Sequence, residues 1–238
     1  MELFEEYKEF GGLPYLQQLK EGKEEYLNNV YDSILLKDIV KRYEIRDIDF
    51  LERLIKFLIG NIGHVFSANN ISKFSKHEKR KANPEKILNY IKYLRNALLF
   101  SRVKREDLKG KGILSFNEKY YLNDHGFYKA LIGDNDHNEG QKLENIIYTE
   151  LLRRGYEITM GIYGDLEIDF VCKKNNHVIY VQVSETLKGE NTRKREFKPL
   201  LQIKDNFPKY IISEDLTNYS KHGIQNINII DFLIDENI

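Results

Sequence analysis

The sequence has 238 residues, which is enough for one large domain or two ordinary domains with separate cores, and we expect two. Lys plus Arg and Asp plus Glu are equal at 37 each, so the overall charge predicts no nucleic-acid partner and only a local surplus can. Cys172 is the only cysteine, which excludes an internal disulfide and a cysteine-based zinc cluster within one chain.

The chain also lacks the sequence signals of membrane and ATPase proteins. Its first thirty residues are charged throughout and have no apolar core of a signal peptide. No apolar run approaches the ~20 residues of a membrane span, so we expect a cytoplasmic chain without a membrane partner. A phosphate-binding loop of the GxxxxGK[ST] type is absent, so this polypeptide alone is not expected to hydrolyse ATP.

Residues 1–46 are predicted to be a helical lead-in and not a domain. They contain "EFGGLPYL" and then "EEYLNNVYDSILLKDIVKRY", in which apolar residues recur at helical spacing. So short a segment cannot bury this apolar face by itself. We expect the face to pack on the next part of the chain or on a domain outside this sequence.

Residues 47–133 have the order of a winged helix-turn-helix. A helix is predicted over 47–62 with Asp49 as its N-cap, and a short one is expected to open at Ser67. A third helix begins with Asn83 as cap and Pro84 at its first position. Strand-like segments at 98–105 and 112–122 follow, with a polar, glycine-containing turn between them. The third helix would be the recognition helix, and residues 103–112 would form the wing.

Positive charge is concentrated in the same part of the chain. Residues 73–111 hold 13 Lys or Arg against 4 Asp or Glu. This surplus favours contact with DNA phosphates, although a solvated charged face or a protein-docking surface would have the same composition. The candidate nucleic-acid-binding residues here are Lys79, Arg80, Lys81, Lys86, Arg102, Lys104 and Arg105.

Residues 134–238 are predicted to form a separate domain. The polar stretch "GDNDHNEG" is typical of a linker or loop. After it the pattern is helix, three strands, helix, strand, which is typical of a mixed-sheet α/β unit. We therefore expect the winged part to end near Gly133 and the sheet to begin after Gly140, with no sheet shared between the two.

Polar residues interrupt two apolar strands of this last part, "LEIDFVCKK" and "HVIYVQVSETL". Asp169 lies in the first strand, and Gln182 and Ser184 lie in the second. Gln182 and Ser184 are two residues apart, so they share one face of the strand. These side chains are either a functional site or a polar cluster whose members hydrogen-bond to one another.

The strand order and these residues resemble the restriction-endonuclease-like PD-(D/E)XK nuclease fold, αβββαβ. In that family a strand Asp, a D/E-x-K motif on the next strand and often a helix Glu hold Mg²⁺ and activate water. The resemblance assigns Asp169 as the strand acid and metal ligand, Glu144 as the helix acid, and Gln182 and Ser184 to the D/E and Lys positions. An amide brings no charge and a hydroxyl cannot replace the Lys, so the motif is degenerate.

Residues at nearby positions are candidate substitutes for the missing Lys and for the helix acid of the motif. Lys173 is four residues after Asp169, Lys188 lies just past the strand, and Glu150 could replace the helix acid. Arg193, Lys194 and Arg195 of "TRKREFK" could add phosphate contacts beside the sheet, or could be the solvated face of a helix.

The landmarks "EFGGLPYL", "LLKDIVKRY", "KYYLNDHGFYKAL", "GQKLENIIYTELLRRGYEI" and "EIDFV" resemble a family of prokaryotic AAA-type ATPases. Those proteins have an ATPase domain, then a winged helix, then a nuclease-like domain. The resemblance implies that this chain is the C-terminal part of such a protein and that an ATPase domain, in cis or in trans, is its partner. Many members have E-V-K where this chain has Gln182, Val183 and Ser184.

Two classes of function remain open from the sequence. The first is DNA binding, with or without Mg²⁺-dependent cleavage. The second is a protein-interaction or regulatory module attached to an ATPase. Salt-dependent binding of DNA distinguishes them, because phosphate contacts release counterions.

Overall fold

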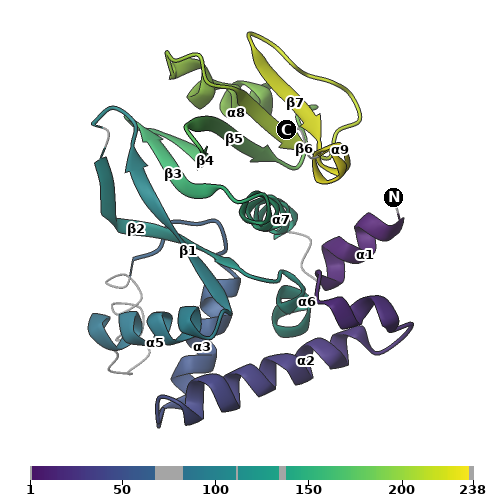
Figure 1. The fold of residues 1–238 in the computed structure, drawn as a ribbon, viewed down its shortest axis with the longest axis vertical. Helices are drawn as coiled ribbons and strands as arrows, with labels where there is room; N and C mark the ends of the chain where they lie inside the picture. Colours follow the sequence, from purple (N-terminus) through teal and green to yellow (C-terminus); the bar gives the residue numbers. More distant parts are fainter. Residues whose placement is uncertain (1, 68–82, 111, 134–137, 236–238) are drawn as a thin grey trace. The chain divides into compact units, whose positions relative to one another are not determined.

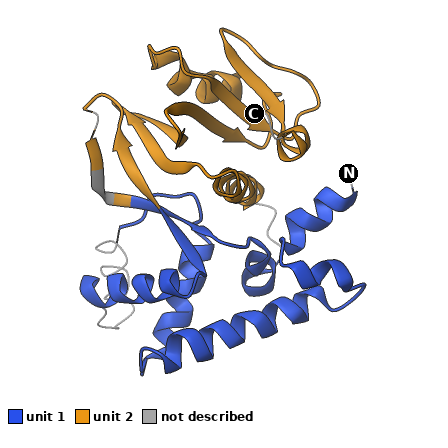
Figure 2. Ribbon diagram, in the orientation of Figure 1, with its two compact units in different colours: residues 1–102, 118–136 blue, residues 103–117, 137–238 orange. Residues whose placement is uncertain are grey.

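The computed structural model describes residues 2–67, 83–110, 112–133 and 138–235, without the side chains of 114–116 (Figure 1). The chain has a mixed α/β architecture with a mixed sheet. It divides into two compact units (Figure 2). Unit 1 comprises Met1–Arg102 and Glu118–Asp136, and unit 2 comprises Val103–Asn117 and His137–Ile238.

Unit 1 is mainly helical. Its described α-helices are α1 (Glu2–Phe10), α2 (Lys23–Ser33), α3 (Ile48–Ile59), α5 (Pro84–Asn96) and α6 (Gly126–Ile132). A 3-10 turn, η1 (Pro14–Gln18), precedes α2, and a π-helical segment, η2 (Ile34–Lys41), continues it.

The first residues of the chain are part of unit 1 and pack on its α6. The Asp124 carboxylate accepts hydrogen bonds from the backbone N–H of Gly12 (2.9 Å) and of Gly126 (2.8 Å). Gly11, at φ +81°, allows the chain to turn against the segment that contains Asp124. Of the two expectations for residues 1–46, packing on a later part of the same chain is therefore the one observed.

Side-chain caps begin two helices of unit 1. The Asn83 carboxamide accepts from Lys86 N (2.8 Å) and Pro84 occupies the first turn of α5, as the sequence predicts. The cap of α3 is Asp47, whose Oδ1 accepts from Phe50 N (3.3 Å), so the prediction of Asp49 was wrong by half a turn. A short helix is expected to open at Ser67, and the residues directly after Ser67 lie outside the described part of the chain.

Most of the mixed sheet belongs to unit 2, and its described strands have the order β2-β1-β3-β4-β5-β6-β7. Residues 100–102 of β1 and 118–122 of β2 fall in unit 1. β3, β4 and β5 are antiparallel neighbours, while the pairs β1–β3, β5–β6 and β6–β7 are parallel. The strands are β1 (Phe100–Asp107), β2 (Gly112–Leu122), β3 (Glu157–Tyr163), β4 (Leu166–Lys174), β5 (His177–Ser184), β6 (Lys209–Ser213) and β7 (Ile224–Asn228). The helices of unit 2 are α7 (Glu139–Arg153), α8 (Glu190–Gln202) and α9 (Ile229–Ile234).

Helices α7 and α8 cover opposite faces of this sheet. On β4, Phe170 lies against Tyr148 of α7, with ring centroids 6.1 Å apart. The next residue, Val171, shares a buried cluster with Phe197 and Leu200 of α8. Because successive strand residues point to opposite faces, the two helices must pack on different sides.

The hairpin expected to be the wing joins this sheet. Lys104 of β1 pairs with Thr159 of β3, and Val103–Asn117 fall in unit 2. The expectation that the sheet begins only after Gly140 is therefore wrong. A hairpin edge has unpaired backbone N–H and C=O groups, and pairing with β3 satisfies them.

None of the described helices combines the length and the apolar composition needed to cross a membrane.

Candidate functional site

The structure brings Asp169 and Gln182 together on β4 and β5. The register pairs Phe170 with Val181, which sets Asp169 beside Gln182. The Asp169 N–H donates to Gln182 Oε1 (3.3 Å), and Asp169 Oδ2 accepts from Val183 N (2.9 Å). Each of the two side chains is only 8% exposed. Asp169 and Gln182 thus tie the two strands together through side chains as well as through the backbone.

Glu196 of α8 completes this polar cluster. Its Oε2 accepts from Gln182 Nε2 (3.1 Å), and its Oε1 accepts from Arg195 Nε (2.8 Å). Glu196 is 5% exposed, whereas the Arg195 side chain is 74% exposed. The Gln182 amide therefore has both ends occupied: its oxygen by a backbone N–H and its nitrogen by a carboxylate.

A cleft of about 580 Å³ opens over this cluster within unit 2. Asp169, Gln182, Val183 and Pro199 are among the residues that line it. Four of its acidic residues come from α7, β4 and the turn before β4: Glu144, Asp165, Glu167 and Asp169. Its basic residues all come from α8: Lys194, Arg195 and Lys198.

Ser184 does not line this cleft. Its hydroxyl donates to Thr186 O (3.1 Å), and Thr186 Oγ1 in turn donates to the buried Asp215 (2.8 Å). Asp215 also accepts from Leu187 N (2.5 Å). Ser184 thus belongs to a network that holds the loop between β5 and α8, although it shares a strand with Gln182.

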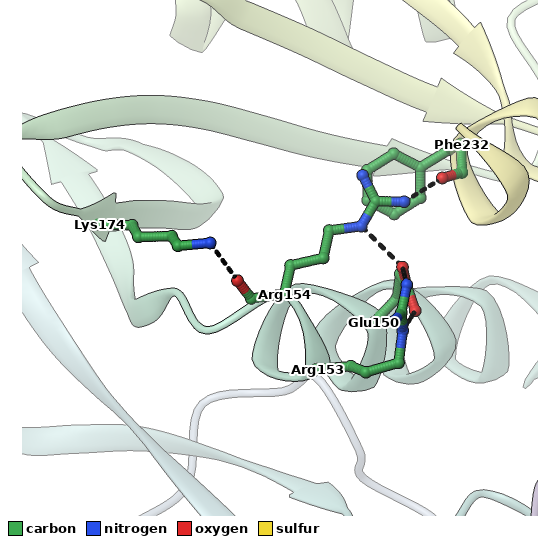
Figure 3. Close-up of polar contacts among 5 residues, drawn as sticks. All are labelled: Glu150, Arg153, Arg154, Lys174 and Phe232. Carbon is green, nitrogen blue, oxygen red and sulfur yellow. Dashed lines mark hydrogen bonds and ion pairs between the residues drawn. The ribbon is translucent and has the colours of Figure 1, made fainter. Parts of the chain in front are cut away.

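The proposed substitutes for the missing groups have other partners. Glu150 accepts from Arg153 Nε (2.7 Å) and from Arg154 Nε (2.6 Å), as Figure 3 shows. Lys173 is ion-paired with the buried Glu106 (2.5 Å). Lys188 lies in the exposed loop before α8 and, like Glu150 and Lys173, is not among the residues that line the cleft.

Arg154 connects the end of α7 to the last helix. Its side chain is 6% exposed and stacks over the ring of Phe232 at 4.3 Å from the centroid. It also donates to the carbonyl oxygen of Phe232 (Figure 3). Burial raises the pKa of Glu150, but the hydrogen bonds from Arg153 and Arg154 outweigh this and hold it below its ordinary value.

The candidate phosphate-binding residues of unit 1 are only partly described. Lys79, Arg80 and Lys81 lie outside the described residues. Lys86 is bonded to Asp47 (2.5 Å), and Arg102 is ion-paired with Glu118 (3.3 Å). Lys86 and Arg102 therefore take part in contacts within unit 1.

The remaining candidates lie in unit 2 and differ in their surroundings. Lys104 is exposed on β1, and Arg105 beside it is partly buried. Arg193 donates from Nη1 to the carbonyls of Leu187 and Lys188, 2.7 Å each, and so anchors the loop before α8. Lys194 forms an exposed ion pair with Glu190 at 2.7 Å.

The donor set of the cleft does not fit the Mg²⁺ site that the sequence motif suggests. Among the described residues, no three His, Cys, Asp or Glu side chains are grouped so as to hold a metal ion. Hard divalent cations take several oxygen ligands with carboxylate charge, and at the motif's second position the only oxygen offered is the Gln182 amide, already bonded to a backbone N–H. We derive no metal-dependent step from this arrangement.

Glu196, Asp165 and Glu167 are cleft residues that the sequence reasoning missed. Glu196 precedes Phe197 and is four residues before Leu200, so it belongs to the buried side of α8. That helical spacing was a usable signal. Glu167 is two residues before Asp169, and the strand period of two places both on one face.

Comparison with known proteins identifies relatives of this chain. A family described as a domain of unknown function, DUF8612, matches residues 1–138. An uncharacterized protein of Haemophilus influenzae is 37% identical over 98% of this chain and 58% of its own length. The uncharacterized protein MJ1544 of Methanocaldococcus jannaschii is 26% identical over 95% of this chain and 51% of its own length.

The chain thus spans about half the length of the curated relatives that it matches. No solved structure matches it significantly. The family model covers more than half of the sequence and ends just before α7. The chain belongs to the DUF8612 family.

Proposed function

We propose that this chain is the C-terminal, nucleic-acid-binding part of an AAA-type ATPase, with a nuclease-like domain that binds and does not cut. The element order α7-β3-β4-β5-α8-β6 agrees with the αβββαβ order of PD-(D/E)XK proteins. The order of α3, α5, β1 and β2 agrees with a winged helix. The additional length of the relatives leaves room for an ATPase domain.

The hydrogen bonding of Gln182 and Ser184 is the observation that carries the proposal of a nuclease-like domain that does not cut. A nuclease of this class needs a carboxylate and a lysine where this chain has Gln182 and Ser184. Gln182 bonds Asp169 N and Glu196, and Ser184 bonds the loop carbonyl of Thr186. Both side chains thus stabilise the fold and neither is placed to activate water for attack on a phosphodiester.

Binding is assigned to the α8 side of the cleft. Lys194, Arg195 and Lys198 border it from one helix. The Lys194 and Arg195 side chains are 72% and 74% exposed. The ion pair of Lys194 with Glu190 is exposed at both ends and therefore weak, so a phosphate group can displace the Glu190 carboxylate. Arg195 is suited to this task because a guanidinium binds phosphate oxygens in a fork geometry.

The first test combines a salt titration with a cleavage assay on the full chain. We expect oligonucleotide affinity to fall with salt, and the double variant Lys194→Ala/Lys198→Ala to reduce the salt slope by about one for each phosphate that it no longer neutralises. Lys221→Ala, at an exposed lysine away from the cleft, is the matched control. Labelled DNA and RNA incubated with Mg²⁺ or Mn²⁺ should remain intact.

Two results would contradict this proposal. Cleavage that Asp169→Ala abolishes would show that the degenerate site is an active nuclease. Salt-independent or absent binding would remove nucleic acid as the ligand.

A protein-docking function is the second candidate, and the ion pairs of unit 1 favour it. Lys86 and Arg102 are bonded to Asp47 and Glu118 and so are less available to phosphates. If docking on an ATPase domain is the function, oligonucleotides will not bind to either unit. The same titration therefore separates the two candidates.

A further inference from the structure

Acidic residues at the start of β4 and lysines of α8 line the cleft of unit 2 together. Asp165 precedes β4 and is exposed, and Glu167 is half-buried at the start of that strand. Lys194 and Lys198, one helical turn apart on α8, supply positive charge to the same cleft. Its volume of about 580 Å³ falls in the range of ~300–1,000 Å³ that small-ligand pockets occupy.

A phosphate chain alone does not explain this charge arrangement. Phosphates are attracted to the lysines but repelled by the carboxylates of Asp165 and Glu167. A ligand that fits both must carry an anionic group and, a short distance away, N–H groups that donate to carboxylates. A nucleotide has this composition, because its base presents amino and imino N–H groups beside the phosphate.

We propose that the cleft binds an unpaired nucleotide of a single strand, with the phosphate on α8 and the base's N–H edge on Asp165 and Glu167. This inference rests on the proposed nucleic-acid function and adds the strand form and the base preference. In a duplex the N–H edges bond the opposite base, whereas an unpaired base offers its Watson–Crick edge to side chains.

The carboxylates predict which bases are preferred. Cytosine offers its N4 amino group and guanine its N1 and N2 hydrogens, both of which suit a carboxylate. Thymine presents the carbonyl oxygens O2 and O4 around a single N–H, and these repel a carboxylate. Cytosine and guanine should therefore bind better than thymine.

Asp165 and Glu167 are assigned this role because Asp165 is exposed and Glu167 half-buried, whereas Asp169 and Glu196 are buried. Asp169 accepts from Val183 N, and Glu196 accepts from Gln182 and Arg195. Asp165 is at the rim of the cleft, beyond the turn at Gly164, where a base can reach it. An exposed rim position also means that its substitution leaves the core intact.

The experiment compares oligo-dC, oligo-dT and a mixed duplex, each of about 12 nucleotides, on the full chain. A pH of about 8 keeps cytosine unprotonated, and fluorescence anisotropy gives the affinities. We expect oligo-dC to bind about tenfold more tightly than oligo-dT, and the duplex to bind most weakly, because hydrogen bonds to charged acceptors are the stronger ones.

The variant Asp165→Asn/Glu167→Gln keeps the shape of both side chains and removes their charge. It should bind oligo-dC and oligo-dT equally, without weakening the binding of oligo-dT. Asp231→Asn, at an exposed acid of α9, is the matched control and should keep the preference.

Each outcome has a defined meaning. Equal binding of oligo-dC and oligo-dT by the unmodified chain, a preference that survives in Asp165→Asn/Glu167→Gln, or tighter binding of the duplex overturns this inference and leaves the proposed function standing. If none of the three ligands binds, the proposed function fails as well.

Discussion

Glu150 is a buried carboxylate that Arg153 and Arg154 hold in its charged form. It is 7% exposed, and Arg154 is as deeply buried. Its pKa is lowered, so its contribution to stability is fully present above the ordinary glutamate value of ~4.3. That contribution is lost as pH falls through the lower folded-state pKa, because the Glu150 carboxylate then becomes protonated in the folded protein as well as in the unfolded chain.

We predict that Glu150→Gln lowers the free energy of unfolding by about 2–3 kcal/mol at neutral pH, because Arg154 loses its charged partner. The difference from the unmodified chain should shrink below a pH of about 4. Urea unfolding at a series of pH values measures it. Glu157→Gln, at an exposed acid, is the control and should change little, and a pH-independent difference for Glu150→Gln would argue against the ion pair as the cause.

For single residues, the sequence predicts which polar residues lie in strands better than it predicts which residues form ion pairs. Asp169 and Gln182 stand out as polar residues in apolar strands, and the structure sets them side by side on β4 and β5. The ion pairs of Lys86 with Asp47 and Lys173 with Glu106 join residues 39 and 67 positions apart. No local pattern specifies such pairs, so the sequence left these lysines as candidates for phosphate contact or for catalysis.

The turn between β4 and β5 depends on two asparagines with left-handed backbone angles. Asn175 has φ +47° and Asn176 has φ +66°. Positive φ at both central residues of a two-residue hairpin is the type I′ geometry, which Asn and Gly adopt at low cost. The two asparagines therefore suit the backbone geometry of this turn.

We predict that Asn176→Val lowers the free energy of unfolding by about 1–2 kcal/mol, because a β-branched residue is strained at positive φ. Asn176→Gly should be tolerated. Thermal unfolding should show the loss as a fall in Tm of about 2–4 °C per kcal/mol. Gln225→Val, at an exposed position of β7 where valine suits the strand, is the control, and a similar loss there would refute the turn-based explanation.

The hairpin of β1 and β2 marks the limit of prediction from local patterns. The ends of β2, at Gly112 and Leu122, follow the predicted strand, and β1 differs from its prediction only by a shift of two residues. Its pairing with β3, at Lys104 and Thr159, was not foreseen. Strand identity depends on local composition, whereas the choice of neighbouring strand depends on which edges meet in space.

On the scale of the whole chain, the division into two units cuts across the sequence. The predicted boundary near Gly133 lies close to the point where the second unit resumes at His137. Val103–Asn117 belong to unit 2 because β1 pairs with β3. Local composition does not predict this second feature, because it depends on which strands pair in the sheet.

The integrity of unit 1 depends on close packing at Gly126. A Cβ atom there would lie 2.0 Å from the carbonyl oxygen of Phe10, a backbone atom that cannot move aside cheaply. We predict that Gly126→Ala lowers the stability of unit 1 by about 1–3 kcal/mol, because the N-terminal segment must be displaced from α6. Hydrogen exchange should show reduced protection in α1, α2 and α6 and retained protection in β4 and β5.

Gly140→Ala, in the first turn of α7 with open space around it, is the control and should be neutral or stabilising. An equal fall in protection in both units of Gly126→Ala would mean that the chain unfolds as one cooperative body, against the division into two.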